Sequence, residues 1–93
     1  MTQLQARPGI NGNSRDDFID AYMALTDARE ALEVALCVLG ENVTNGRNYL
    51  HLSPSHADET CKADKRRTQE TIEDAREALS ALQSEIENIL EST

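Results

Sequence analysis

The stretch Ala31-Leu32-Glu33-Val34-Ala35-Leu36-Cys37-Val38-Leu39 is the least polar segment of the chain and ends a candidate helix over residues 14–39. Along residues 14–39, large apolar residues recur alternately four and three positions apart, with Arg29 in the gap between Leu25 and Leu32, which is helical spacing. They are Phe18, Tyr22, Leu25, Leu32, Leu36 and Leu39. Only Glu33 is charged in the quoted stretch. A helix that is apolar on all sides is normally covered on more than one side, so we expect more than one neighbour.

Both ends of this first helix carry boundary signals. Ser14 and Asp17 have the spacing of a capping box, with Asp in place of the usual Glu or Gln. Gly40 stands where a left-handed C-cap glycine belongs. The pattern therefore predicts a helix that begins near residue 14 and ends near residue 39.

A second helix is predicted over residues 54–91. Ser53-Pro54 supplies an N-cap and a proline at the first helical position, and no Gly or Pro follows. The largest apolar residues of its stripe are Ile72, Leu79, Leu82, Ile86 and Ile89. Thr71 and Asp74 could cap a new helix, so a break near 67–71 is the main alternative.

The remaining segments are the first 13 residues and the connection over 40–53. Pro8-Gly9 and Asn11-Gly12-Asn13 interrupt regular structure, so residues 1–13 are expected to form a flexible arm. The connection contains Tyr49, Leu50 and Leu52, which are too apolar for a free loop. We expect them to fold back over the end of the first helix.

The fold class is thus all-α, a long antiparallel helical hairpin that forms one domain over residues 14–93. A simple hairpin would place Phe18 beside residue 77 and leave Leu82, Ile86, Ile89 and Leu90 with little cover from their own chain. Two hairpins could bury these surfaces together, which favours a homodimeric four-helix bundle. A monomeric three-helix bundle with a break near 67–71 is the alternative.

One hexapeptide occurs twice, as Asp27-Ala28-Arg29-Glu30-Ala31-Leu32 and as Asp74-Ala75-Arg76-Glu77-Ala78-Leu79. These residues are also simply good helix formers, so duplication and chance both explain the repeat. In either case both segments present the same kind of small-residue packing face.

Charge and composition exclude several classes of function. The net charge is −8, with the acid concentrated in residues 14–39 and 72–93, which argues against broad nucleic-acid or anionic-membrane binding. There is no apolar signal-peptide core near Met1 and no run long enough to cross a membrane. We therefore expect a cytoplasmic protein.

Two clusters are candidate sites. A hairpin could gather Cys37, His51, His56 and Cys61 into a zinc set, but no pair has the usual short ligand spacing, so we expect packing cysteines and surface histidines. The basic cluster is Lys62, Lys65, Arg66 and Arg67. These four residues could contact phosphate or an acidic partner. We favour a simpler interpretation, in which they pair with neighbouring carboxylates on the same helix.

No catalytic motif, metal or cofactor site emerges, so the chain is expected not to be an enzyme. We interpret it as a small acidic protein-binding module, an accessory regulator or inhibitor of the kind that phages and mobile elements carry. The expected contact patch is Ile19, Met23 and Val34 with the rim Asp20, Asp27 and Glu30, unless the homodimer uses these residues. Alternatives are a nucleic-acid-binding hairpin dimer, an acidic nucleic-acid mimic and a purely structural dimerisation module.

Overall fold

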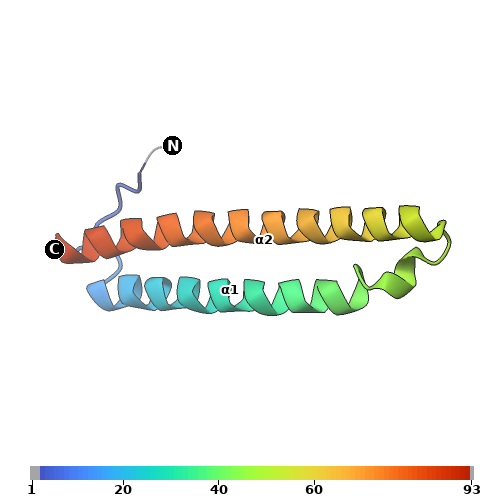
Figure 1. Cartoon of the computed structure of the whole chain (residues 1–93). Helices are drawn as coiled ribbons and strands as arrows, with labels where there is room; N and C mark the ends of the chain where they lie inside the picture. Colours follow the sequence, from blue (N-terminus) through green and yellow to red (C-terminus); the bar gives the residue numbers. More distant parts are fainter. Residues whose placement is uncertain (1–2, 93) are drawn as a thin grey trace. The chain divides into compact units, whose positions relative to one another are not determined.

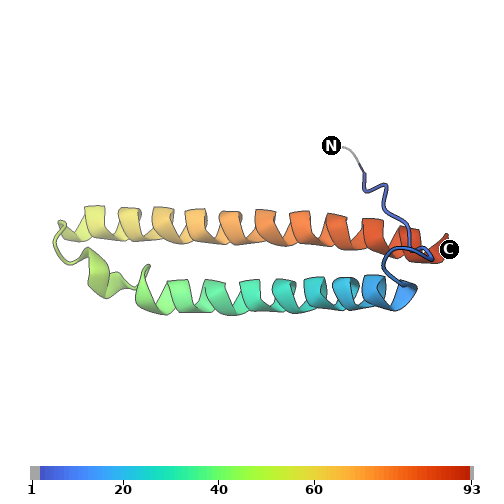
Figure 2. The same ribbon diagram turned by 180° about the vertical axis from the view of Figure 1, so that it is seen from behind.

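The computed structural model describes residues 3–92, which form two α-helices joined by a short 3₁₀-helix. Helix α1 spans Arg15–Asn42, η1 spans Gly46–Tyr49 and α2 spans Pro54–Glu91. The long helices pack as a hairpin, and residues 3–92 contain no strand (Figure 1 and Figure 2). The all-α hairpin predicted from the sequence is confirmed.

Helix α2 begins at Pro54 and runs for 38 residues without a break. The amide of Ala57 donates a 2.7 Å hydrogen bond to the carbonyl of Ser53, which places Ser53 at the cap. The break considered near 67–71 is not present, because those residues lie inside the continuous helix. The three-helix alternative therefore does not describe this fold.

Helix α1 ends later than the sequence indicated. It passes through Gly40 and stops at Asn42, and Gly40 does not have a positive φ. The expected left-handed cap at Gly40 is therefore wrong. The amides of Val43 and Thr44 both donate to the carbonyl of Leu39 at 2.9 Å, so the helix end is closed without a left-handed residue.

The chain divides into two compact units that each contain part of both helices. Unit 1 combines Met1–Glu30 with Arg76–Thr93, and unit 2 is Ala31–Ala75. In unit 1, the guanidinium of Arg15 donates a 3.2 Å hydrogen bond to the carbonyl of Leu90. Phe18 lines a common cleft with Ile86 and Ile89, and both isoleucines are buried. The expectation that this end of α2 lacks cover from its own chain is wrong.

The pairing of Phe18 with Ile86 and Ile89, rather than with residue 77, has its cause in unit 2, where the connection packs on α2. The Sγ of Cys61 donates a 3.3 Å hydrogen bond to the carbonyl of Thr44, and Tyr49 contacts Asp64. The first turns of α2 therefore pair with the connection rather than with α1. A simple hairpin with a short turn would pair the first turns of α2 with the end of α1. That assumption is why the sequence analysis placed Phe18 beside residue 77.

The set of buried residues within the described range is small. It comprises Gln83, Ile86 and Ile89 in unit 1 and Thr44 and Tyr49 in unit 2. Helix α1 buries none of its 28 residues. Nine of the eleven predicted core residues are only half-buried, namely Phe18, Tyr22, Leu25, Leu32, Leu36, Leu39, Ile72, Leu79 and Leu82.

The repeated hexapeptide has the same burial pattern in its two copies. Arg29 and Arg76 are half-buried, as are Leu32 and Leu79. The first, fourth and fifth residues of both copies are exposed. Both segments therefore turn the same positions inward.

Candidate partner-binding surface

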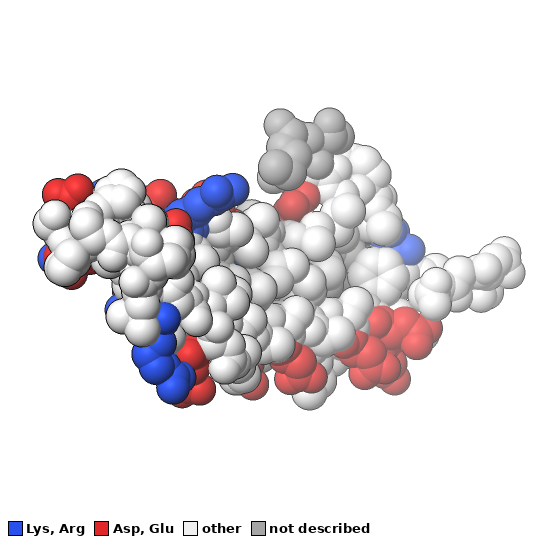
Figure 3. Space-filling view, turned by 90° about the vertical axis from the view of Figure 1, so that its right-hand side faces the viewer, with Lys and Arg blue, Asp and Glu red and all other residues white. Residues whose placement is uncertain are grey.

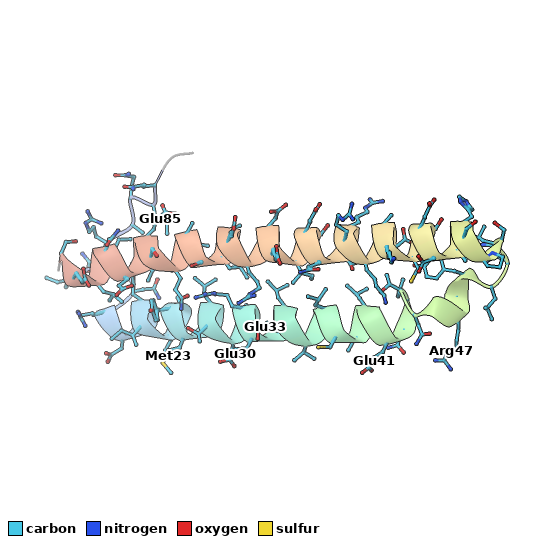
Figure 4. All side chains as sticks on the ribbon, in the orientation of Figure 1. Met23, Glu30, Glu33, Glu41, Arg47 and Glu85 are labelled. Atoms are coloured by element: carbon cyan, nitrogen blue, oxygen red, sulfur yellow. The ribbon has the colours of Figure 1, made fainter. Side chains whose placement is uncertain are left out.

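In unit 1, α1 presents an acidic and apolar surface on the side away from α2. Met23 is 59% exposed, and both Met23 and Glu30 project away from α2 (Figure 4). Asp20 and Asp27 are also exposed, whereas Ile19 is half-buried. Acidic side chains lie next to uncharged ones at the surface (Figure 3). Five of the six predicted contact residues thus lie on one helix segment of unit 1.

The sixth predicted residue, Val34, lies in unit 2 and is 63% exposed. Val38 is 47% exposed, and Ala31 and Cys37 are exposed as well. The other side of the same segment is half-buried and carries Leu32, Ala35, Leu36 and Leu39. The apolar half of α1 is therefore covered on one side only.

Of the three apolar residues in the connection, Tyr49, Leu50 and Leu52, it is Tyr49 that is buried and bonded to α2. Tyr49 is buried and Leu52 is half-buried, whereas Leu50 is 81% exposed. The expectation that Leu50 folds back is wrong, because Leu50 follows the last residue of η1 with its side chain exposed, whereas the hydroxyl of Tyr49 reaches Asp64 on α2. Hydrogen bonding to Asp64, followed by burial, raises the pKa of Tyr49 to about 12.

The basic cluster on α2 is exposed at all four positions. Lys62 pairs with Asp58 at 3.0 Å, one helical turn earlier. No comparable ion pair is recorded for Lys65, Arg66 or Arg67 with any residue in the described range 3–92. The interpretation of local pairing therefore applies to Lys62, while the other three cations face solvent.

The four candidate zinc ligands lie in different settings within unit 2. Cys37 is exposed on α1, and His51 and His56 are exposed on either side of the start of α2. Cys61 is half-buried, where its thiol donates to Thr44. Within residues 3–92, no three His, Cys, Asp or Glu side chains come together in a group that could hold a metal ion.

A buried polar network in unit 1 was not anticipated from the sequence. Gln83 is 4% exposed, and its Nε2 donates to the carbonyl of Tyr22 at 3.0 Å and to Oγ1 of Thr26 at 2.5 Å. Its Oε1 accepts a 2.8 Å hydrogen bond from Nη1 of Arg29. Gln83 lies four positions after Leu79 on the inward stripe of α2, and this spacing was the sequence signal that could have predicted its burial.

The N-terminal residues from Gln3 onward have no regular structure, yet they contact the helices of unit 1. The amide of Leu4 donates a 2.8 Å hydrogen bond to Oε1 of Glu85. Leu4 and Ala6 line a cleft of about 270 Å³ together with Phe18, Ala21 and the two buried isoleucines. This part of the arm therefore lies over the apolar core of unit 1.

Among the described residues, neither long helix has the length and apolar character needed to cross a membrane. No protein-family model, curated protein or solved structure matches the chain. The physical properties of its surfaces are therefore the basis for assigning a function.

Proposed function

We propose that the chain is a non-enzymatic protein-binding module, an accessory regulator or inhibitor that acts by occupying a surface on another protein. The observation that carries this proposal is the exposure of Met23, at 59%, on a helix that buries none of its residues. Methionine is flexible and polarisable, and it is over-used at protein-binding surfaces. Its position on the outer side of α1 supports a role in contact rather than in packing.

The binding site comprises Ile19, Met23, Asp20, Asp27 and Glu30, all in unit 1. Ile19, Met23, Asp27 and Glu30 follow one another at four, four and three positions, so they share one side of the helix. An apolar centre with a charged rim is the usual organisation of a transient interface. The complementary partner has an apolar recess bordered by Lys or Arg, and the mechanism is steric.

We also propose that two chains pair into a four-helix bundle. The supporting observation is that nine of the eleven predicted core residues are only half-buried within their own chain. Bundles of this type bury such stripes between facing helices. Short helical chains commonly obtain a sufficient core by oligomerising.

A second candidate function is contact with a phosphate-bearing ligand such as nucleic acid. It is favoured by the exposure of Lys65 and Arg66, for which no ion pair with a described residue is recorded. It is opposed by the composition of unit 2, which has eight acidic and five basic residues. If duplex DNA binds at low salt and changing Lys65 and Arg66 to Glu abolishes the binding, this candidate is supported; no binding to begin with rejects it.

The protein-binding proposal is tested by capture from the cells that make the protein, followed by reconstitution with the purified partner. Met23→Asp should lose the partner while its helix content and solution mass stay unchanged. Val43→Asp is the matched control, because Val43 is 53% exposed and lies outside the site. Retention of the partner by Met23→Asp would reject the site. Loss of self-association instead would assign Met23 to the interface between copies.

A further inference from the structure

We propose that the apolar cleft over Phe18, Ile86 and Ile89 binds a short, non-helical segment of a partner protein, and that the N-terminal arm occupies this cleft as a built-in competitor. The partner segment carries one leucine-sized apolar side chain between neutral or basic neighbours. Every residue of the cleft belongs to unit 1. The cleft shares no residue with the Met23 site, so this inference goes beyond the function proposed above.

The arm shows which side chain the cleft accepts. Leu4 lines the cleft, of about 270 Å³, together with Phe18, Ile86 and Ile89. These three residues come from both helices of unit 1, and the two isoleucines are buried. Contact with such a surface removes part of the leucine side chain from water, which is favourable. The cleft therefore selects an apolar side chain at this position.

A second cleft, of about 320 Å³, holds the backbone of the bound segment. Leu4 lines this cleft too, opposite Glu85, Asn88 and Ser92, which follow one another at three and four positions and so share one side of α2. The amide of Leu4 donates a 2.8 Å hydrogen bond to Oε1 of Glu85, which lies beside the arm (Figure 4). A carboxylate that accepts from a main-chain amide makes a charge-assisted hydrogen bond with any segment that presents its backbone there.

The charge of unit 1 selects against an acidic ligand. Residues 14–30 and 76–93, which complete unit 1 beside the arm, have nine acidic and three basic residues. Residues 3–13 have no acidic residue, and their one charged residue, Arg7, lines the second cleft with Glu85. The segment that is seated on the site thus complements its charge. A partner segment with Lys or Arg near its apolar residue has the same complementarity.

The arm can be replaced because it covers the site incompletely. Leu4 remains 40% exposed, and both clefts beside it retain volume. Within the described residues 3–12, the hydrogen bond recorded to a long helix is the one from Leu4 to Glu85. A short tether gives the arm an effective concentration in roughly the millimolar range, and a partner segment has to outcompete it. Binding of the partner therefore releases the arm.

The test uses the arm as its own probe, a synthetic peptide of residues 3–9 added to the purified full chain. Binding is read from the methyl resonances of Ile86 and Ile89 as the peptide is titrated to millimolar concentration. Leu4→Asp, whose own arm is detached, should bind the peptide roughly tenfold or more tightly than wild type, because its cleft is free. Ile10→Asp is the matched control, since it adds the same charge at a fully exposed arm position and should behave as wild type. A peptide with Asp in place of the leucine should bind neither chain.

Further variants separate the cleft from the added charge. Leu4→Gly opens the arm without a new charge and should bind the peptide as Leu4→Asp does. In that background Glu85→Lys should weaken binding, because it removes the acceptor and reverses the charge beside Arg7. Glu87→Lys makes the same reversal at an exposed position outside both clefts and should have the smaller effect.

The outcomes that overturn the proposal are distinct. No methyl shift in either opened chain would reject the cleft as a binding site. Equal affinity in opened and wild-type chains would reject the arm as its competitor. Equal binding of the peptide that lacks leucine would reject the apolar selectivity, and equal weakening by the two lysine variants would reject the role of Glu85. None of these results bears on the Met23 site, which is tested separately.

Discussion

The hydroxyl of Tyr49 donates a 2.7 Å hydrogen bond to Oδ2 of Asp64, fifteen positions further along the chain. Together with the contact between Cys61 and Thr44, it fastens the connection to the first turns of α2. Those turns are thereby removed from pairing with α1. The offset of the helices thus follows from the contacts of the connection with α2, those of Tyr49 with Asp64 and of Thr44 with Cys61.

The first prediction is that this contact makes stability fall at alkaline pH. The pKa of Tyr49 is raised from 10.0 to about 12, first because its hydroxyl donates to Asp64 and then because it is buried. The folded state therefore prefers the protonated phenol. Its contribution to stability is complete below pH 10 and is lost as the pH rises through about 12. Chemical denaturation between pH 9 and 12 measures this loss.

The control for that measurement is Tyr49→Phe, which keeps the ring and removes the titrating hydroxyl. Its stability should lack the Tyr49 component of the alkaline decline. Identical alkaline profiles for the two proteins would show that the hydrogen bond to Asp64 does not govern the decline.

The second prediction concerns the polar network around Gln83. Gln83→Ala removes the acceptor for Arg29 and the donor to Thr26 and Tyr22, all in unit 1. Because those groups are left part-buried without this partner, the free energy of unfolding should fall by about 1–3 kcal/mol. Gln69→Ala is the control, since Gln69 is exposed and its side chain donates to Glu73 at the surface, and should change stability by less than about 0.5 kcal/mol. Urea denaturation would contradict the prediction if both variants lost the same amount.

The hairpin and most of its inward residues could be predicted because helical periodicity and caps are local properties. The start at Pro54 and the half-buried or buried state of all eleven predicted core residues follow from spacing alone. The register could not be predicted, because it depends on Tyr49 meeting Asp64 across the connection. Gln83 was missed for a related reason, since a polar residue on an inward stripe is acceptable only when its partners are in place. The exposed residues of α1 could also be located from periodicity, but periodicity does not specify which molecule covers them.

The third prediction concerns the start of α1. Oγ of Ser14 accepts a 3.3 Å hydrogen bond from the amide of Asp17, and Oδ2 of Asp17 accepts one from the amide of Ser14 at 3.1 Å. The capping box with Asp at its last position is therefore confirmed. Ser14→Ala should lower the free energy of unfolding by about 1 kcal/mol, whereas Ser84→Ala, at an exposed interior position of α2, should change it little. Equal stability of the two variants would show that the cap is dispensable.

Acid should act on the same cap. A hydrogen bond from Asn13 is the main cause that lowers the pKa of Asp17 below 3.8, followed by the bond from the Ser14 amide. The folded state therefore prefers the ionised carboxylate. Its contribution is present above pH 3.8 and is lost as the pH falls through the lowered value. Asp17→Asn should remove this component of the acid dependence, as measured by urea denaturation between pH 2 and 6.

The fourth prediction is that the arm protects the apolar core of unit 1. Leu4 lines the cleft with Phe18, Ile86 and Ile89, and its amide donates to Glu85. Leu4→Asp places a carboxylate beside Glu85 and in the apolar cleft, so the arm should detach. The methyl resonances of Ile86 and Ile89 should then shift, and the fluorescence of an apolar dye should rise. Ile10→Asp is the control, because Ile10 is fully exposed in the same arm and should change neither signal. If Leu4→Asp gave the methyl spectrum of wild type, the arm would not cover the core in solution.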